Sequence, residues 1–131
     1  LVSPKSKYPF FFNDWEKNYK TNNTKTLIIK KKNWIIGQLS FNLKIKGEIH
    51  IFHLIIDPKF QRKGFGSHFM NNLINEYEKL EIKKILLEVS ESNLIAKKFY
   101  NKFQFRTVGI RKNYYKDGSN ALLKEKKLIK K

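Results

Sequence analysis

Residues Asp57 to Ser67 read DPKFQRKGFGS, and this stretch decides how the rest of the chain is interpreted. An apolar run, Ile49 to Ile56, precedes it with the composition of a buried strand, and an amphipathic segment follows it. A strand, a basic glycine-containing turn and a helix start together form an anion site. The first N–H groups of a helix have no partner within it, and the helix dipole adds positive charge there. The sequence therefore predicts that this turn holds the pyrophosphate of a nucleotide-type cofactor.

The turn supports this prediction only in combination with other residues. Gly64 and Gly66 let phosphate oxygens approach the backbone, and Arg62 and Lys63 add full positive charges. The spacing matches neither the P-loop, G-x-x-x-x-G-K-[ST], nor the dinucleotide-binding fingerprint, G-x-G-x-x-G. Taken alone, the turn is equally well explained as an ordinary strand-to-helix connection.

Length and composition limit the class of protein. A chain of 131 residues with 40% hydrophobic residues predicts one domain with a real core. The sequence has no apolar run of 18 residues, so no membrane span is expected. With no Cys and three His, we expect no disulfide, no cysteine nucleophile and no metal site. The sequence as given starts with Leu and shows no signal-peptide pattern, and we expect a cytoplasmic protein, with an organelle left open.

The formal charge of +17 invites a nucleic-acid interpretation. The basic residues are mostly Lys, however, and they are spread along a chain that is also rich in Asn and Ile, which indicates a compositional habit. We therefore do not expect nucleic acid as a specific ligand. Attraction of an anionic cofactor or of a ribosomal surface is a further role for the charge.

Hydrophobic periodicity predicts an α+β (mixed α/β) fold with a central mixed sheet. The first three strands have short connections and should be antiparallel, whereas the fourth should run parallel to the third because a helix connects them. A turn at Lys116–Ser119 should close a C-terminal β-hairpin. The expected elements are a helix at 14–19, strands at 26–29, 34–43 and 48–56, a helix at 65–80, a strand at 84–89, a helix at 93–103 and strands at 105–111 and 120–129.

Three residues are candidates for chemistry. Glu88 stands in the otherwise apolar strand ILLEV, either as a carboxylate at a ligand-binding strand end or simply as a strand end in water. Asn93 and Tyr100 are two helical turns apart and share a face. On pattern alone, a Tyr at such a position is more commonly a core aromatic with a hydrogen-bonded hydroxyl.

Together these motifs resemble the GCN5-related N-acetyltransferases (the GNAT family) over about residues 48–105. The motifs are L-x-I-D-P-x-x-Q-R-K-G-F-G-S, then L-E-V at Leu87–Val89, then S-N-x-x-A-x-x-x-Y at Ser92–Tyr100. In the tail, R-K-N-Y-Y at Arg111–Tyr115 followed by D-G-S-N-A-L-L resembles the RimI-type subgroup, the ribosomal-protein alanine N-acetyltransferases.

The resemblance implies a GNAT-like fold with acetyl-CoA as cofactor. It implies that the third and fourth strands splay apart, and that backbone groups beside the splay bind the pantetheine arm. These backbone groups belong to Leu54, Ile55 and Ile56. It assigns the pyrophosphate to Arg62, Lys63, Gly64, Phe65, Gly66 and Ser67, and a further cofactor contact to Asn93.

In the RimI type, the position of Glu88 is the general base and that of Tyr100 the general acid, while Tyr114 and Tyr115 border the peptide site. His53 is a reserve candidate for the base, because a lone His in a sheet is more often structural. The implied function is direct transfer of acetyl to the α-amino group of a protein N-terminus, with a ribosomal-protein alanine as the finer expectation. The alternatives are a GNAT that acts on a small-molecule amine, and a non-catalytic basic module that binds RNA or the ribosome.

The chemistry agrees with these roles. An α-amino group has a pKa near 8 and a lysine amine one near 10.4, so the lysine costs about 3 kcal/mol more to deprotonate at neutral pH. A single carboxylate base is therefore better matched to an N-terminal amine. The absence of Cys favours direct transfer in a ternary complex over an acyl-enzyme.

The sequence departs from the family pattern at two places. The Gly-Phe that usually follows the second helix is Gln104-Phe105 here, so that turn is expected to be built differently. The family's first strand and first helix are not apparent before Pro9. We therefore expect one domain over residues 1–131 whose N-terminal lobe is missing or abbreviated.

Overall fold

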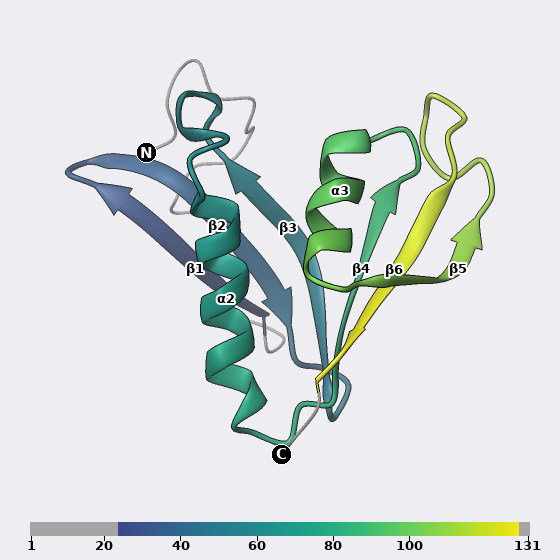
Figure 1. Ribbon diagram of the computed structural model, residues 1–131, viewed down its shortest axis with the longest axis horizontal. Helices are drawn as coiled ribbons and strands as arrows, with labels where there is room; N and C mark the ends of the chain where they lie inside the picture. Colours follow the sequence, from purple (N-terminus) through teal and green to yellow (C-terminus); the bar gives the residue numbers. More distant parts are fainter. Residues whose placement is uncertain (1–23, 129–131) are drawn as a thin grey trace.

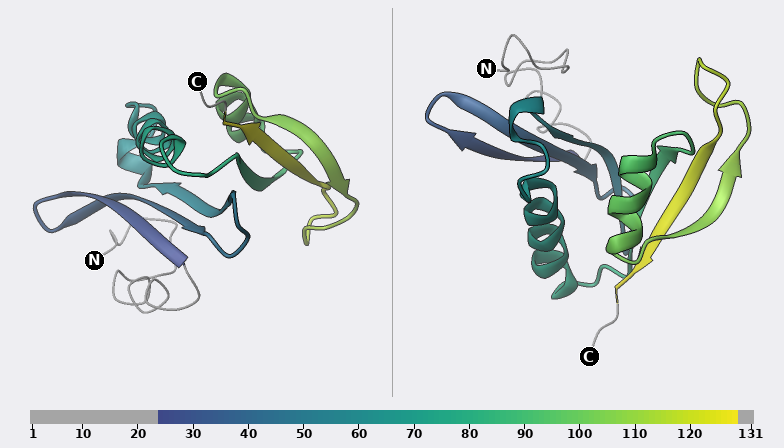
Figure 2. Two further views of the ribbon diagram at one scale, coloured as in Figure 1. Left: turned by 90° about the horizontal axis from the view of Figure 1, so that it is seen from below. Right: turned by 45° about the horizontal axis from the view of Figure 1, so that its top comes forward.

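The computed structural model describes residues 24–128, except for the side chain of Lys31. In this part of the chain, six strands form one sheet in the order β1-β2-β3-β4-β6-β5, and both α-helices cover the same face of it (Figures 1 and 2). The elements are β1 (Thr24–Lys31), β2 (Trp34–Asn42), β3 (Glu48–Ile56), the 3-10 turn η1 (Pro58–Phe60), α2 (Phe65–Glu78), β4 (Lys84–Ser90), α3 (Leu94–Lys102), β5 (Arg106–Arg111) and β6 (Ala121–Lys127).

The sheet consists of two arms that meet at β3 and β4. The first arm is the antiparallel meander β1-β2-β3, and β3 pairs with β4 in parallel, so both predictions are confirmed. In the second arm the last strand, β6, lies between β4 and β5 and is antiparallel to both. The mixed fold class and its C-terminal hairpin are thereby confirmed; the prediction had not included the position of β6.

The two arms separate because β3 and β4 pair over only three positions, from Glu48–Lys84 to His50–Leu86. Immediately beyond, the register of β3 against β2 shifts: Phe41 faces Ile51, whereas the neighbouring Ser40 faces His53. The extra residue between them forms a bulge, which bends a strand and increases its twist. The strands beyond the bulge therefore diverge, and the ribbon has the shape of a V with the helices on one side (Figure 1). This is the splay that the resemblance implied.

The core lies between the helices and the sheet. The expected stripe of α2 is buried at Phe69, Leu73 and Tyr77, and these side chains pack against Leu39, Phe41, Ile49 and Ile85. Helix α2 ends at Glu78, two residues before its predicted end, and the Leu80 side chain is exposed. The predicted boundaries of the other helices and strands agree within about two residues, and the predicted helix at 14–19 lies outside the described residues.

Helix α3 is fixed at both ends by local hydrogen bonds. Its N-cap is Asn93, whose Oδ1 accepts from the backbone N–H of Ala96 at 3.1 Å. At the other end, Gln104 N–H donates to the Asn101 carbonyl and Phe105 N–H donates to the Tyr100 carbonyl. This pair of bonds is a Schellman motif, which requires a left-handed residue at Gln104. The observed φ is 66°.

Candidate functional site

A cavity of about 700 Å³ lies between α3 and the loop that joins β3 to α2. Most of the residues predicted to bind the cofactor line it together: Leu54, Ile56, Arg62, Gly64, Phe65, Gly66, Ser67 and Asn93. Ile55 and Lys63 are not part of the lining. Ile55 lies opposite Gln38 in the β2–β3 register, and the Lys63 ammonium lies 5.7 Å from the Phe60 ring centroid.

The loop is shaped by two left-handed residues, Arg62 with φ 63° and Gly64 with φ 88°. Gly64 is the N-cap of α2, and its carbonyl accepts from His68 N–H at 2.9 Å. Before them, Asp57 caps the 3-10 turn by accepting from Lys59 N–H at 3.0 Å. Backbone N–H groups at such a helix start favour a bound anion. The geometry therefore supports the predicted anion site, with Gly64 required for its backbone conformation.

Gly66 has a packing role in addition to the phosphate contact predicted for it. A Cβ at this position would lie 3.2 Å from Phe99 Cε1, closer than nine in ten real Cβ contacts. Gly66 therefore makes room for the ring of Phe99 and lets α2 and α3 approach at the cavity. The sequence did not indicate this contact, because the two residues are far apart in the chain.

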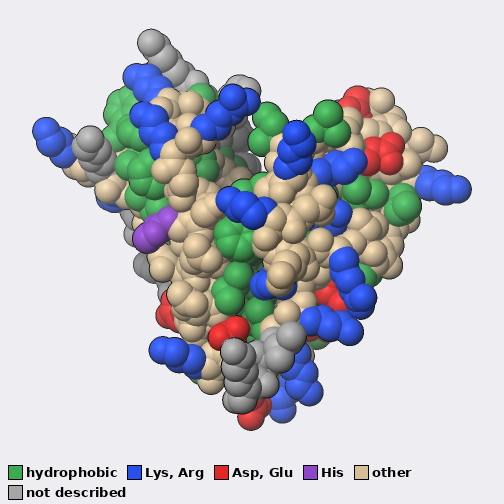
Figure 3. Space-filling view, viewed as in Figure 1, with side chains coloured by type: hydrophobic (Ala, Val, Ile, Leu, Met, Phe, Trp, Pro, Cys, Tyr) green, Lys and Arg blue, Asp and Glu red, His purple; other side chains and the backbone are tan. Residues whose placement is uncertain are grey.

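Lys102 is a cavity residue that the sequence reasoning missed. Its Nζ donates to Ser67 Oγ at 2.8 Å and lies 5.6 Å and 5.3 Å from the ring centroids of Phe99 and Phe103. It brings a full positive charge from α3 to the first turn of α2. In the sequence, nothing distinguishes Lys102 from the many other lysines. Figure 3 shows such side chains distributed over the face that carries the helices.

Tyr100 lines the same cavity and is fixed by aromatic neighbours. Its ring contacts those of Phe99 and Phe105 edge to face, with centroids 5.2 Å and 5.5 Å apart. The residue is 9% exposed, and burial raises the pKa of its hydroxyl to about 12. At neutral pH this phenol therefore keeps its proton and acts as a hydrogen-bond donor or acceptor.

Glu88 lies on the other face of the sheet. In β4 the neighbouring residues Leu87 and Val89 are buried in the core beneath the helices, so the side chain of Glu88 points away from it. Glu88 does not line the cavity, and 34% of its side chain is exposed. Leu86 is the last residue of β4 that pairs with β3, and Glu88 lies two residues beyond it. Glu88 therefore borders the separation of the arms. The structure thus places the two predicted catalytic residues on opposite faces of the sheet.

Tyr114 and Tyr115 lie in the β5–β6 hairpin, where both backbone N–H groups donate to the Ser119 carbonyl. Their rings meet edge to face at 5.1 Å. The pKa of Tyr115 is raised by burial, by the carboxylate of Glu88 and by Tyr114. Tyr115 therefore lies within electrostatic range of the Glu88 carboxylate. The reserve candidate His53 faces Ser40, and burial lowers its pKa.

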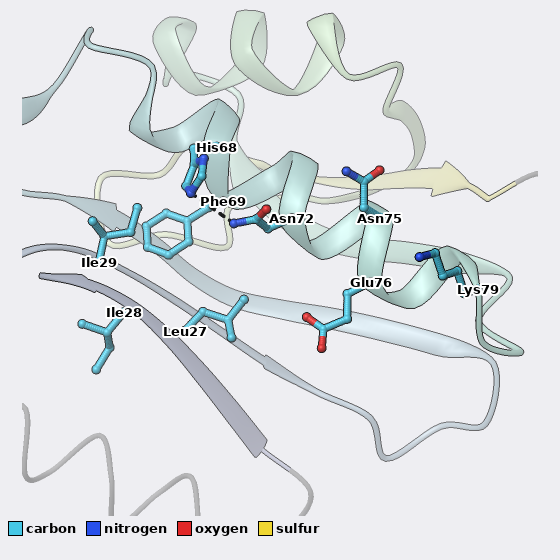
Figure 4. Close-up of a pocket in the computed structure, with 9 residues that line it drawn as sticks. All are labelled: Leu27, Ile28, Ile29, His68, Phe69, Asn72, Asn75, Glu76 and Lys79. Atoms are coloured by element: carbon cyan, nitrogen blue, oxygen red, sulfur yellow. Dashed lines mark hydrogen bonds between the residues drawn. The ribbon is translucent and has the colours of Figure 1, made fainter.

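A second cavity, of about 460 Å³, lies between β1 and α2 (Figure 4). Apolar side chains of β1 face a polar stretch of α2, where His68 Nε2 and Asn72 Nδ2 are 3.1 Å apart. None of the predicted catalytic or cofactor residues belongs to its lining. Neither described helix is long and apolar enough to span a membrane, and residues 24–128 contain no cluster of His, Asp and Glu suited to a metal ion.

The comparisons with known proteins agree on one family. A family model described as the acetyltransferase (GNAT) family matches residues 2–105. The ribosomal protein bS18-alanine N-acetyltransferase of Haemophilus ducreyi is 42% identical over 80 residues, which cover 58% of this chain and 55% of that protein. The chain spans about half the length of the curated relatives it matches.

Solved structures share the fold. The ribosomal-protein-S18-alanine N-acetyltransferase of Escherichia coli superposes with a TM-score of 0.78 at 25% identity, covering 95% of this chain and 81% of that one. A GNAT family acetyltransferase from Elizabethkingia anophelis with acetyl-CoA bound gives a TM-score of 0.75 at 23% identity, covering 88% and 82%. Because the family model matches well over half of its residues, the chain belongs to the acetyltransferase (GNAT) family.

Proposed function

We propose that this protein is an acetyl-CoA-dependent N-acetyltransferase that acetylates the α-amino group of a protein N-terminus, with the alanine of a ribosomal protein as the specific acceptor. The observation that carries the proposal is the arrangement of the predicted anion-binding loop and Tyr100 around one cavity, with Glu88 on the opposite face of the sheet beside the splay. The similarity to an alanine N-acetyltransferase that acts on bS18 supports the choice of acceptor.

The residues present fit the cofactor. The diphosphate would lie at the start of α2, against the backbone of Gly64 to Ser67, with Arg62 and Lys102 supplying positive charge. The pantetheine arm would follow β3 along Leu54 and Ile56, where this strand has left its pairing with β4. The unpaired edge of β3 offers backbone groups to an amide-containing chain, and N–H groups there can stabilise a tetrahedral oxyanion. Bound acetyl-CoA supplies the thioester that the acceptor amine attacks.

Glu88 is proposed as the general base. Its carboxylate is on the face of the sheet opposite the cavity, so an acceptor amine on that face would meet the thioester through the splay. Proton removal, directly or through one water, then frees the amine lone pair. An α-amino group, with a pKa near 8, loses its proton to a carboxylate at a smaller cost than a lysine amine does.

Tyr100 is proposed to act on the leaving sulfur. Complete proton transfer from a phenol with a pKa of about 12 to a thiolate whose thiol has a pKa of about 8.5 is uphill by about 5 kcal/mol. A hydrogen bond from the Tyr100 hydroxyl stabilises the developing thiolate without this cost. The general-acid role implied by the resemblance therefore becomes mainly hydrogen-bond donation, and the thiolate would take up the proton that the attacking nitrogen loses as it becomes an amide.

The test is acetyl transfer by the purified protein, followed by mass spectrometry. The acceptor is a synthetic peptide with the N-terminal sequence of bS18, and the control is the same peptide with its α-amino group blocked and a lysine left free. We expect acetylation of the first peptide only. Glu88→Gln and Tyr100→Phe should each lower kcat by about a hundredfold and leave the Kd of CoA unchanged in calorimetry.

Two results would contradict the proposal. Acetylation of the lysine in the blocked peptide would remove the N-terminal specificity, and full activity of both variants would remove the assigned roles. Acetylation of polyamines but of neither peptide would favour the small-molecule alternative. Salt-dependent RNA binding with no acetyl transfer to any of these amines would favour the non-catalytic module.

A further inference from the structure

The carboxylate of Glu88, on β4, is bound by a side chain of β5, a strand that does not pair with β4. Arg111, the last residue of β5, places its Nε 2.8 Å from Glu88 Oε2. Strand β6 lies between β4 and β5, so the guanidinium reaches across a whole strand. The distance is that of a short charge-assisted hydrogen bond.

The register of β6 makes this contact possible. Arg111 lies opposite Ala121, and Glu88 lies opposite Leu123, two residues further along the same strand. The two side chains are therefore on one face of the sheet, and the Arg111 chain passes diagonally over a position occupied by the smallest chiral residue. Ala121 is completely buried.

The same guanidinium also contacts the hairpin proposed to border the acceptor. Its Cζ lies 5.8 Å from the centroid of the Tyr114 ring, a cation–π distance, and Tyr114 packs edge to face on Tyr115. One side chain thus connects Glu88 to the loop that carries both tyrosines. A carboxylate held on one oxygen by a planar guanidinium loses rotational freedom.

We infer that Arg111 is a positioning residue for acetyl transfer, which orients the Glu88 carboxylate toward the acceptor amine and couples it to the Tyr114–Tyr115 hairpin. This inference rests on the proposed function, because Arg111 acts through Glu88 and not on the substrates themselves. Its contribution should therefore disappear when Glu88 can no longer serve as the base.

The experiment measures peptide acetylation by Arg111→Ala, Arg111→Lys, Glu88→Gln and the double variant Glu88→Gln/Arg111→Ala. We expect Arg111→Ala to lower kcat about tenfold or more, with the KM of acetyl-CoA within about twofold. Arg111→Lys should be intermediate, because an ammonium keeps the charge but not the planar geometry. Ethylguanidinium added to Arg111→Ala should restore part of the lost kcat. The double variant should be no slower than Glu88→Gln alone.

The matched control is Arg106→Ala. Arg106 is also exposed on β5 and also pairs with a glutamate of the sheet, Glu125, at 3.9 Å, but at the end remote from Tyr114. It should keep kcat within about twofold, and thermal unfolding of each variant reports any loss of folding. If Arg111→Ala does not fold, Arg111→Lys takes its place. The deciding values are then the kcat of Arg111→Lys relative to the parent and the kcat of Glu88→Gln/Arg111→Lys relative to Glu88→Gln.

The inference is overturned if Arg111→Ala keeps the parent kcat while Glu88→Gln is inactive, and the proposed function then still stands. It is also overturned if the double variant is a further tenfold slower than Glu88→Gln, because Arg111 would then act independently. If Glu88→Gln itself keeps full activity, the base assignment fails and the inference fails with it.

Discussion

Gln104 occupies a position that favours glycine and still builds the turn that glycine would build. It is left-handed at φ 66°, and the two hydrogen bonds of the Schellman motif are both present. The hydrophobic contact that accompanies this motif joins Phe105 to Tyr100, with ring centroids 5.5 Å apart. The expectation of a differently built turn is therefore wrong. Gln104 adopts this unfavourable backbone conformation, and the turn that it forms fixes Tyr100 at the cavity.

We predict that Gln104→Gly stabilises the protein by about 1 kcal/mol and raises Tm by about 3–5 °C, because a side chain in the left-handed region is unfavourable. Thermal unfolding by circular dichroism measures the effect. The control is Lys98→Gly, an exposed position within α3, which should lose about 1 kcal/mol. A lower Tm for Gln104→Gly would show that the side chain makes a stabilising contact that offsets its backbone strain.

At the scale of elements, one bulge in β3 determines where the cavity forms. Before the bulge, β3 pairs with both β2 and β4; after it, β3 stays with β2 and leaves β4. The part beyond the bulge is held against the helix side by close packing at Gly37 of β2. There a Cβ would lie 2.7 Å from Ile56 Cδ1 and 2.9 Å from Phe69 Cε2. Glycine thus lets β3 and α2 approach next to the cavity.

We predict that Gly37→Ala costs about 1–3 kcal/mol of unfolding free energy and weakens CoA binding, because the new methyl group displaces Ile56 toward the cavity that it lines. Urea unfolding and calorimetric titration with CoA measure the two effects. The double variant Gly37→Ala/Ile56→Val, which removes the clashing Cδ1, should recover part of both. Unchanged CoA affinity in a destabilised Gly37→Ala would show that the site tolerates movement of this wall.

At the scale of the whole molecule, ion pairs join the two arms at the end where β3 and β4 are paired. Glu48 Oε1 lies 2.8 Å from His50 Nε2, and Lys84 lies 3.5 Å and 3.6 Å from Glu48 and Glu125. Arg106 extends the series to β5 through Glu125. Four strands, β3, β4, β6 and β5, are therefore linked at the closed end of the V, while the other end stays open for ligands.

Because of this network, part of the free energy of unfolding varies with pH in the acidic range. The hydrogen bond with His50 is the main cause that lowers the pKa of Glu48, and the charge of Lys84 adds to it. A carboxyl group with a lowered pKa stabilises the folded state above its unfolded pKa, and this stability is lost as the pH falls through the folded pKa. We predict that Glu48→Gln is less stable than the parent at pH 7 and that the difference closes below about pH 4.5.

Chemical unfolding at a series of pH values measures this difference, with Glu76→Gln, an exposed position on α2, as the control. The control should differ little from the parent at every pH. A destabilisation by Glu48→Gln that stays constant down to pH 3 would show that packing, and not the charge of Glu48, is responsible.

Most of the local structure followed from sequence pattern alone. The loop from Asp57 to Ser67, the strand before it and the helix after it were predicted in place, because glycine, proline and hydrophobic period act over a few residues. The parallel pairing of β3 and β4 followed from the crossover helix. The family motifs, all within about 60 residues, were sufficient to indicate the fold and the cavity side of the site.

Tertiary structure alone decided the contacts between distant residues. The sequence could not show that Gly66 makes room for Phe99, that Lys102 reaches Ser67, or that β6 lies between β4 and β5. The ion pair of Arg111 with Glu88 spans that inserted strand, because the registers of β4 and β5 against β6 place both side chains on one face, 2.8 Å apart. Local pattern fixes the elements, because it reflects neighbours in the chain. Strand order and the splay arise from packing among elements, which a linear pattern does not contain.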